Sequence, residues 1–466
     1  MKDSALSAFV ASFRGRIIRP GDAEYDTARA LYNGMIDKRP LAILRPTDAA
    51  DVAAAVAFGR DQGLPIAIRG GGHSGPGFGS CNDGLCIDLS AFKKIQVDPD
   101  ARTVRVGAGC TAGEVDRATH PFGLAVPFGI VARTGVAGLT LGGGTGYLTR
   151  RYGLTLDNLL EAEVVLADGR IVAANETSEP DLFWAIRGGG GNFGVVTSFL
   201  FRAHPVSVVF GGPVFWEGKH ARTVMRAYRD FLPGTPEDLG IFVGLKRVPA
   251  TDPFPREHWG QFACAVIGCY VGDAEEGRRQ MAPLLDALPE PMFDWRSEMP
   301  YPSLQSMFDP LMPAGLQWYW KGDFVRSLPD AAIDVHIGQW GEAAGELSLM
   351  HLYPIDGAVH RVAPDATAWS TRDAAFSMVI VGVSADPAQA DALKTWGRRY
   401  WNAIHPFNLQ GGYLNFMMDD EEGDRVRATF GPNYRRLAAV KAVYDPANLF
   451  RVNQNIEPEA TMTRGA

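Results

Sequence analysis

The chain has 466 residues, of which 46% are hydrophobic and 21% are charged, and its formal net charge at pH 7 is -8. This size and composition predict a soluble globular protein with room for two or three domains. The negative charge argues against a nucleic-acid or anionic-membrane partner, and no apolar run approaches the roughly 20 residues that cross a bilayer.

The cysteines and the N-terminus bear on the cellular compartment. The five cysteines are odd in number and loosely spaced, which favours reduced thiols, although Cys81 and Cys86 could bridge. No cysteine pair has zinc-ligand spacing with partners nearby, so we expect no metal site. Residues 1–11 form a short amphipathic stretch without the long apolar segment of a signal peptide. We therefore expect a cytoplasmic protein.

The first 205 residues predict short helices that alternate with short strands. We expect helices to begin at Thr47, at a capping box formed by Thr111 and Glu114, and at Pro180. Apolar or alternating runs predict strands at residues 65–68, 85–89, 103–106, 163–167, 170–173 and 195–201. Asp168 and Gly169, which separate two of these runs, predict a hairpin.

Three glycine clusters interrupt this region, at residues 69–75, 134–146 and 188–194. A backbone without side chains can approach a large anionic or planar ligand, and its amides can face phosphate oxygens. The first cluster presents one imidazole, His73, although a flexible loop with an incidental histidine is the plainer interpretation. The third contains GxGxxG, but a helix precedes it and a strand follows, the reverse of a Rossmann site. We therefore reject an NAD site and expect the clusters to converge on one extended ligand with a pyrophosphate.

The middle of the chain has fewer glycines and more aromatic residues. Strand candidates at 261–267, 347–353 and 376–382, with helix candidates at 273–288 and 388–405, predict an antiparallel sheet covered by helices on one side. Aromatic residues such as Trp318 and Trp320 are more often core than pocket. Because ligand sites often lie between domains, we expect this sheet to build the substrate wall.

Four stretches carry a resemblance to a known family. Residues 69–74, 142–153 and 181–194 resemble the FAD-binding domain of the vanillyl-alcohol-oxidase (PCMH-type) superfamily. Residues 431–455 resemble the end of its berberine-bridge-enzyme-like branch, and the match is good over 40–205 and 411–458.

The resemblance implies an α+β fold with a two-part FAD-binding domain. Its parts are residues 1–205 and a returning C-terminal segment, 411–466. Residues 206–410 then form the substrate-binding domain, with the antiparallel sheet covered on one side.

The resemblance also implies how FAD is held. His73 matches the family histidine that is attached through a ring nitrogen to the flavin 8α-methyl group. Val131 stands where many relatives have a cysteine bonded to flavin C6, so we expect a single covalent link. Thr134 matches the oxygen gatekeeper beside flavin C4a, and its valine-like shape favours an oxidase over a dehydrogenase.

The expected FAD contacts come from the glycine clusters and the C-terminal segment. They are Arg69, Gly70, Gly71, Gly72, His73, Ser74, Val131, Thr134, Gly135, Gly138, Gly142, Gly143, Gly144, Gly146, Tyr147, Asn192, Gly194, Val195, Val196, Asn415, Asn453 and Asn455.

Three side chains are candidates for the residue that takes the substrate proton. Residues 354–357 match a family turn that follows a flavin-facing strand, and the strand period of two puts His351 and Tyr353 on one face. Tyr413 lies in a segment that resembles the family's Tyr-x-Asn-Tyr, but Phe416 replaces the second tyrosine, so that base is missing if the family uses it.

We prefer Tyr413 as the base. Because an ordinary tyrosine has a pKa of about 10, it would need a neighbouring cation, which His351 could supply, or a shift induced by the flavin. His351 as the base, or as a hydrogen-bonded core histidine, stays open, and Tyr353 is kept as a substrate contact. Lys321 could equally be a surface lysine.

Together these features predict an FAD-dependent oxidoreductase that transfers a hydride to flavin N5 from an alcohol, a sugar or a secondary metabolite. The expected partners are this small-molecule substrate and O2, the acceptor. The alternatives are oxidative cyclisation or dehydrogenation of a natural product, or a flavin-carrying binding protein without turnover. The substrate itself and the oligomeric state are left open.

Overall fold

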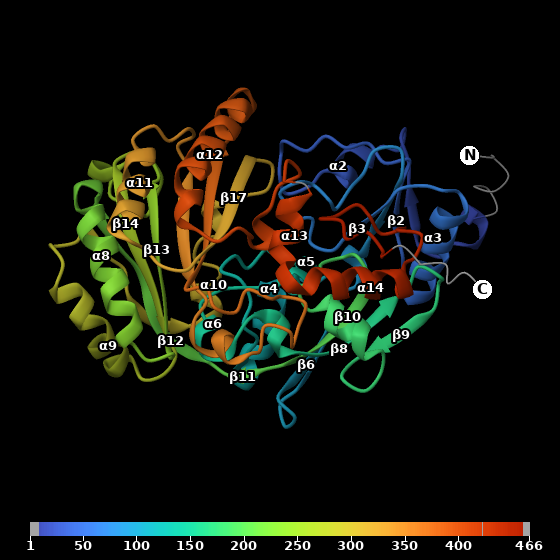
Figure 1. Cartoon of the computed structure of the whole chain (residues 1–466), viewed down its shortest axis with the longest axis horizontal. Coiled ribbons are helices and arrows are strands. Elements are labelled where there is room, and N and C mark those ends of the chain that lie inside the picture. Colours follow the sequence, from blue (N-terminus) through green and yellow to red (C-terminus); the bar gives the residue numbers. More distant parts are fainter. Residues whose placement is uncertain (1–8, 422, 460–466) are drawn as a thin grey trace.

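The computed structural model describes residues 9–421 and 423–459, which form two neighbouring bodies (Figure 1). Residues 1–8, part of the stretch on which the absence of a signal peptide was predicted, lie outside the described residues. No helix within 9–421 and 423–459 is long and apolar enough to cross a membrane.

Two small sheets build the first body. A mixed sheet has the order β1-β2-β4-β3. An antiparallel sheet has the order β5-β6-β10-β8-β9, and the short strands β7 and β11 pair separately. The strands are β1 (Arg16–Ile18), β2 (Ala42–Arg45), β3 (Ile66–Arg69), β4 (Leu85–Asp88), β5 (Ile95–Asp98), β6 (Thr103–Gly107), β7 (Leu124–Ala125), β8 (Leu159–Val165), β9 (Ile171–Ala174), β10 (Val195–Arg202) and β11 (His204–Pro205).

Short helices connect and cover these sheets. They are α2 (Tyr25–Arg29), α3 (Ala49–Asp61), α4 (Ala112–Thr119), α5 (Val136–Gly142), α6 (Thr149–Tyr152) and α7 (Pro180–Ile186). Helix α3 contacts strands of both sheets and so joins them. The capping box at Thr111 and the hairpin of β8 and β9 are confirmed. Helix α3 is capped by Asp48, one residue after the predicted Thr47, because the Asp48 carboxylate accepts the Asp51 amide.

The second body contains one large antiparallel sheet of order β15-β12-β14-β13-β18-β19-β17, with β16 also paired to β12. Its strands are β12 (Val208–Glu217), β13 (Leu239–Arg247), β14 (Phe262–Tyr270), β15 (Phe293–Asp294), β16 (Ser297–Pro300), β17 (Gln317–Val325), β18 (Leu349–Pro354) and β19 (Phe376–Ser384). Its helices are α8 (Ala221–Phe231), α9 (Ala274–Asp286), α10 (Tyr301–Gln305), α11 (Asp330–Trp340) and α12 (Ala390–Ile404).

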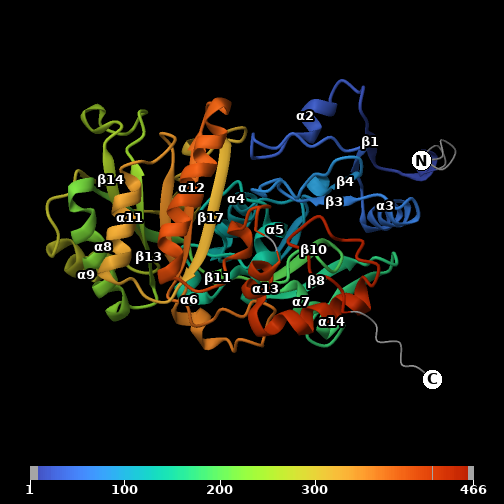
Figure 2. The same cartoon turned by 45° about the horizontal axis from the view of Figure 1, so that its top comes forward.

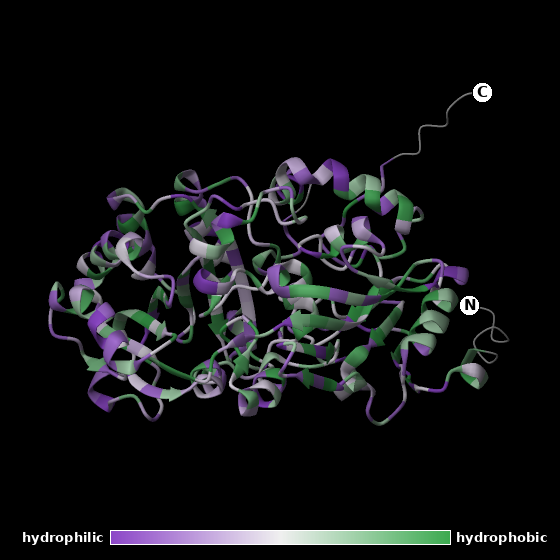
Figure 3. Cartoon of the chain, turned by 90° about the horizontal axis from the view of Figure 1, so that it is seen from below, coloured by the Kyte–Doolittle hydropathy of each residue, from purple (hydrophilic) through white to green (hydrophobic). Residues whose placement is uncertain are grey.

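The large sheet has two different faces because its side chains alternate. Helices α8, α9, α11 and α12 cover one face, as predicted, and are seen on the left of Figure 1. On β18, Met350 and Leu352 pack in the core beneath these helices, whereas Leu349 and Tyr353 belong to the core of the opposite face. We call this opposite face the inner face. In Figure 3 the peripheral helices carry both hydrophilic and hydrophobic residues, as expected for helices buried on one side.

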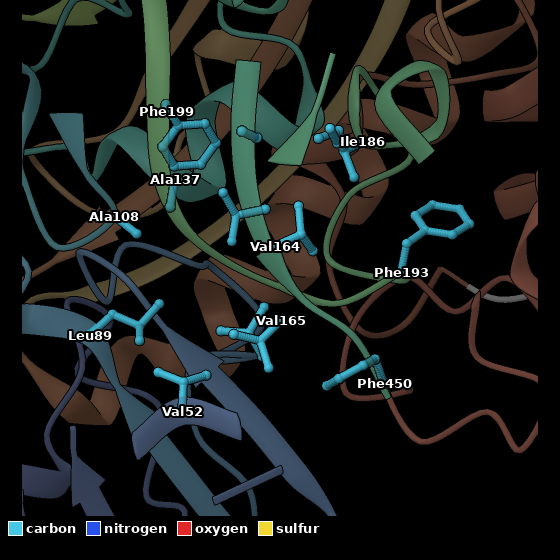
Figure 4. Packing of buried hydrophobic residues seen from close by; sticks show 14 of the residues in the cluster. Val52, Leu89, Ala108, Ala137, Val164, Val165, Ile186, Phe193, Phe199 and Phe450 are labelled. Atoms are coloured by element: carbon cyan, nitrogen blue, oxygen red, sulfur yellow. The ribbon is translucent and has the colours of Figure 1, made fainter. Parts of the chain in front are cut away.

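The C-terminal segment returns to the first body through α13 (Asp424–Phe430) and α14 (Tyr434–Tyr444). Helix α14 packs on α7, and Figure 2 shows the two helices next to each other. A single hydrophobic core joins this segment to α3, α5 and the strands. Figure 4 shows Phe450 with Val52, Leu89, Ala108, Ala137, Val164, Val165, Ile186, Phe193 and Phe199.

A buried ion pair anchors α14 and the segment that follows it. Lys441 is fully buried on α14, and its ammonium lies 2.7 Å from the Asp445 carboxylate. The ammonium also donates to the carbonyls of Asn192, at 2.6 Å, and Phe450, at 2.9 Å. Lys441 therefore connects the third glycine cluster, α14 and the irregular segment that follows α14.

Lys441→Met is expected to lower the free energy of unfolding by about 3–5 kcal/mol, because it leaves the Asp445 carboxylate buried without its counter-ion. Urea unfolding at pH 7, followed by far-UV circular dichroism, measures this. Lys394→Met, on α12 and with no ion pair among the described residues, is the matched control. A loss no larger than that of the control would show that the pair contributes nothing net.

Candidate active site

One cavity lies where the glycine clusters meet the inner face of the large sheet. The glycine side of its wall is made by some of the residues in each of four ranges: 66–79, 129–145, 190–196 and 450–454. The sheet side is made by Trp318, Trp320, Leu349, His351, Tyr353, Val379 and Val381. The segments predicted to converge on one ligand therefore do converge, and the sheet closes the cavity from the other side.

Most of the predicted cofactor residues line this cavity. They are Arg69, Gly70, Gly71, Gly72, His73, Ser74, Val131, Thr134, Gly135, Gly138, Gly142, Asn192, Gly194, Val196, Asn415 and Asn453. Gly143, Gly144, Gly146, Tyr147, Val195 and Asn455 do not line it. Gly144 lies behind the wall, where its amide donates to Tyr413, and Tyr147 is buried against Phe242 of β13.

His73 is held by an aromatic stack. Its ring centroid lies 3.8 Å from that of Tyr32, with 19° between the planes, and Tyr32 stacks in turn on Trp318 at 5.0 Å. Burial lowers the pKa of His73 to about 4, so the imidazole is neutral near pH 7 and keeps a nitrogen lone pair. Its Nε2 is buried and has no hydrogen-bond partner among the described residues.

The glycines of the wall serve two purposes. Gly71 and Gly135 let two loops touch: a Cβ on Gly71 would lie 2.5 Å from the Gly135 Cα. Gly138 and Gly191 keep space open, since a Cβ on either would meet no protein atom within 4 Å and both residues line the cavity. A long ligand can therefore approach the backbone at these two positions.

Tyr413 is bound to the second glycine cluster. Its hydroxyl oxygen accepts the Gly144 amide at 2.6 Å and the Asn415 side-chain amide at 2.8 Å. Asn415 also donates to the Leu139 carbonyl at 3.1 Å. Burial raises the pKa of Tyr413 to about 12 despite these two donors. The phenol is thus neutral near pH 7, and its contacts fix the turn behind the cavity.

His351 and Tyr353 form a pair on the inner face. The His351 Nδ1 and the Tyr353 hydroxyl are 2.6 Å apart, and both side chains are buried. Burial, assisted by the positive charge of Lys246, lowers the pKa of His351 to about 3, and burial raises the pKa of Tyr353 above its usual range. His351 is therefore neutral and bonded to Tyr353. The resting imidazole is therefore not the cation expected beside Tyr413, because desolvation lowers its pKa, and its Nδ1 stays available as an acceptor toward the Tyr353 hydroxyl.

Lys321 is buried, so the interpretation of Lys321 as a surface lysine is wrong. It is buried on β17, and its ammonium lies 3.0 Å from Asp420 and 3.3 Å from Glu421. Alternation along β17 puts it on the opposite side from Trp318 and Trp320, which line the cavity.

Sequence reasoning missed several residues of the cavity wall. Tyr32 was not singled out, because its contact with His73 depends on a loop 41 positions away in sequence, and Met312 lies in an irregular segment. Trp318 and Trp320 were noticed but judged more often core than pocket. The signal that could have found them is their spacing of two residues, which puts both side chains on the same face of any strand that contains them.

Comparisons with known proteins agree with this arrangement. A family model described as "FAD binding domain" matches residues 40–175, and one described as "Berberine and berberine like" matches residues 412–457. An uncharacterised FAD-linked oxidoreductase of Bacillus subtilis is 32% identical over 95% of this chain and 97% of its own length. The (R)-6-hydroxynicotine oxidase of Paenarthrobacter nicotinovorans is 28% identical over 98% of this chain and 100% of its own.

Solved structures show the same fold. The wild-type BBE-like 1 protein of Physcomitrella patens superposes with a TM-score of 0.87 at 26% identity, covering 97% of this chain and 99% of its own. Glucooligosaccharide oxidase of Acremonium strictum, which holds a 6-S-cysteinyl, 8α-N1-histidyl FAD, gives a TM-score of 0.85 at 24% identity, with 98% and 100% covered. At that identity the second comparison supports the fold alone.

Proposed function

The chain belongs to the berberine-bridge-enzyme-like family of FAD-linked oxidoreductases, and we propose that it is an oxidase whose FAD is bonded to His73. The proposed substrate is an alcohol, a sugar or a secondary metabolite that gives up a hydride. The observation that carries the proposal is the single cavity in which the glycine clusters and His73 face the His351 and Tyr353 pair.

The residues present fit FAD. Gly138 and Gly191 leave backbone open to a long ligand. Residues of three glycine-rich turns line the wall, and the backbone amides of such turns suit a pyrophosphate. His73 offers a neutral imidazole, the form able to bond to the 8α-methyl group. Val131 has no thiol, which supports a single link rather than the histidyl and cysteinyl pair of the Acremonium strictum enzyme.

The chemistry that bound FAD supplies is acceptance of a hydride from a substrate carbon and passage of both electrons to O2. Thr134 lines the cavity beside the loop of His73, and its valine-like shape supports use of O2.

This chain's own residues handle the substrate proton. We assign that role to Tyr353 and His351, in the tautomer where the Tyr353 hydroxyl donates to Nδ1 of His351. The Tyr353 oxygen then has lone pairs free for a substrate O–H or N–H, and its own proton can pass to His351 over 2.6 Å. Tyr413 is already occupied by two donors and positions the Gly144 turn.

Gly138→Val is expected to reduce the FAD content of the purified protein at least tenfold, because its side chain would extend into the cavity. The ratio of flavin absorbance to protein absorbance measures this. Gly338→Val is the matched control: Gly338 is also helical, also exposed and also free of contacts within 4 Å, but it lies on α11 and is not part of the cavity wall. Normal FAD content in Gly138→Val would place the cofactor elsewhere.

The function is tested by anaerobic bleaching of the flavin across a panel of sugars, aryl alcohols and polyketides. An oxidase is expected to bleach with at least one class and to release H2O2 when air is admitted. Bleaching that only an artificial dye reverses would indicate a dehydrogenase. A product with a new ring or double bond and no carbonyl would support oxidative cyclisation or dehydrogenation, and no bleaching by any compound would support a binding protein.

A further inference from the structure

One lysine of the inner face, Lys246, lies next to residues of the cavity wall, although it is not itself one of the wall residues. Lys246 lies on β13, two residues from Gly244, and the Cβ of a residue at Gly244 would touch the His351 ring at 2.6 Å. Alternation therefore puts Lys246 on the same face as His351. In the register of β13 and β18, Lys246 is opposite Leu349, which lines the cavity.

Lys246 differs from the other lysines that are shielded from solvent. Lys321 and Lys441 are paired with carboxylates, and Lys38 donates to the Gly77 carbonyl at 2.9 Å. Lys246 is half-buried, yet its ammonium makes no hydrogen bond or ion pair with any residue in 9–421 or 423–459. A shielded ammonium without a partner is costly and is unusual unless an anion arrives to pair with it.

The charge of Lys246 is nevertheless present at the site. Desolvation lowers its pKa to about 8, so it is mostly protonated at pH 7, and no carboxylate contributes to that shift. The positive charge of Lys246 acts on His351 and contributes to lowering the pKa of His351.

The surrounding wall is apolar. Trp318, Trp320, Leu349, Val379 and Val381 form it with the His351 and Tyr353 pair. These side chains provide few of the donors and acceptors that a sugar with many hydroxyls needs, and they suit a flat aromatic body.

We propose that Lys246 binds a carboxylate of the substrate, so that the site takes an aromatic or similarly hydrophobic acid, with its oxidisable carbon placed toward Tyr353. This inference rests on the proposed function, since it concerns the substrate of the same cavity. An N–H donor to a carboxylate in a shielded site discriminates strongly against a neutral group of the same shape.

The test uses the FAD-loaded protein and pairs of ligands that differ only in charge: benzoate and benzamide, cinnamate and cinnamamide, 2-naphthoate and 2-naphthamide. The Kd of each is read from the change in the flavin absorption spectrum, which requires no turnover. We expect at least one carboxylate to bind about tenfold or more tightly than its amide. Lys246→Met should remove that preference and leave the amide Kd unchanged, whereas Lys246→Arg should retain it and Lys394→Met should not alter it.

Equal binding of carboxylates and amides, no binding of either series, or a preference that survives Lys246→Met would overturn the assignment. Flavin content and bleaching by the substrate panel are measured on the same samples. A protein that bleaches with neutral alcohols but ignores carboxylates keeps the oxidase function and loses only the role of Lys246. A protein that prefers carboxylates but never bleaches keeps the anion site and loses the oxidase.

Discussion

His73→Ala is expected to abolish the flavin that stays with the protein after acid precipitation, while the wild type keeps a yellow, fluorescent band in a denaturing gel. Alanine removes the ring nitrogen proposed to bond the 8α-methyl group. The wall of glycines remains, so reversible FAD binding should persist at reduced occupancy. Because a covalent link is expected to raise the flavin potential, substrate should also reduce the flavin of this variant more slowly.

Two controls separate the link from general damage near the cavity. His204→Ala removes a half-buried histidine that is also neutral near pH 7, hydrogen bonded to Asn158 at 2.6 Å and absent from the cavity wall, and should keep the covalent flavin. Tyr32→Phe preserves the aromatic ring that stacks on His73, so this variant should also keep the covalent flavin. Acid-stable flavin in His73→Ala would show that another residue carries the link.

Much of the first body could be predicted from the sequence, because its helices and turns are specified by residues close to one another in the chain. Capping residues, a two-residue turn and glycine clusters are short-range signals, and they predicted α4, the hairpin of β8 and β9, and the converging turns. The antiparallel sheet and its one-sided helical cover also followed from the pattern of the middle segment. These features depend on neighbours in sequence, or on alternation along one strand.

The missed features depend on which strand faces which loop. Alternation placed His351 and Tyr353 together, but nothing local shows that Lys321 turns away from the cavity toward Asp420, while Trp318 turns toward Tyr32. The stack of Tyr32 on His73 joins two loops of the first body and a strand of the second. Such contacts come from tertiary packing, which the pattern of a single segment does not encode.

Choosing the base needed the same tertiary information. From the sequence, Tyr413 and His351 looked like partners, because both belong to segments that resemble flavin-facing parts of the family. In the structure, the donors that surround Tyr413 come from Gly144 and Asn415, and the neighbour of His351 is Tyr353. Phe416, which stands where the family has a second tyrosine, has its ring centroid 6.2 Å from that of Tyr353. The ring of Tyr353, on β18, thus lies near the position where the family has its second tyrosine, and we propose that its hydroxyl takes the place of the one missing at Phe416.

Tyr353→Phe is expected to slow anaerobic flavin reduction by about 100-fold or more, because it removes the hydroxyl that receives the substrate proton. His351→Gln should cause a loss of similar size, since the proton could no longer pass from Tyr353 to Nδ1. Stopped-flow measurement of bleaching at saturating substrate isolates this step from the reaction with O2. Both variants should keep normal FAD content, because neither side chain belongs to the glycine side of the wall.

Tyr413→Phe provides the opposite pattern and so distinguishes the two candidates. It leaves the Gly144 amide and the Asn415 side chain without their shared acceptor, which should cost about 1–3 kcal/mol of stability. Its flavin reduction rate should stay within a few-fold of wild type. If Tyr413→Phe instead stopped flavin reduction while Tyr353→Phe left it intact, the proton would have to leave through Tyr413. The two donors on its oxygen would then serve to stabilise a phenolate, because hydrogen bonds to a charged form favour that form.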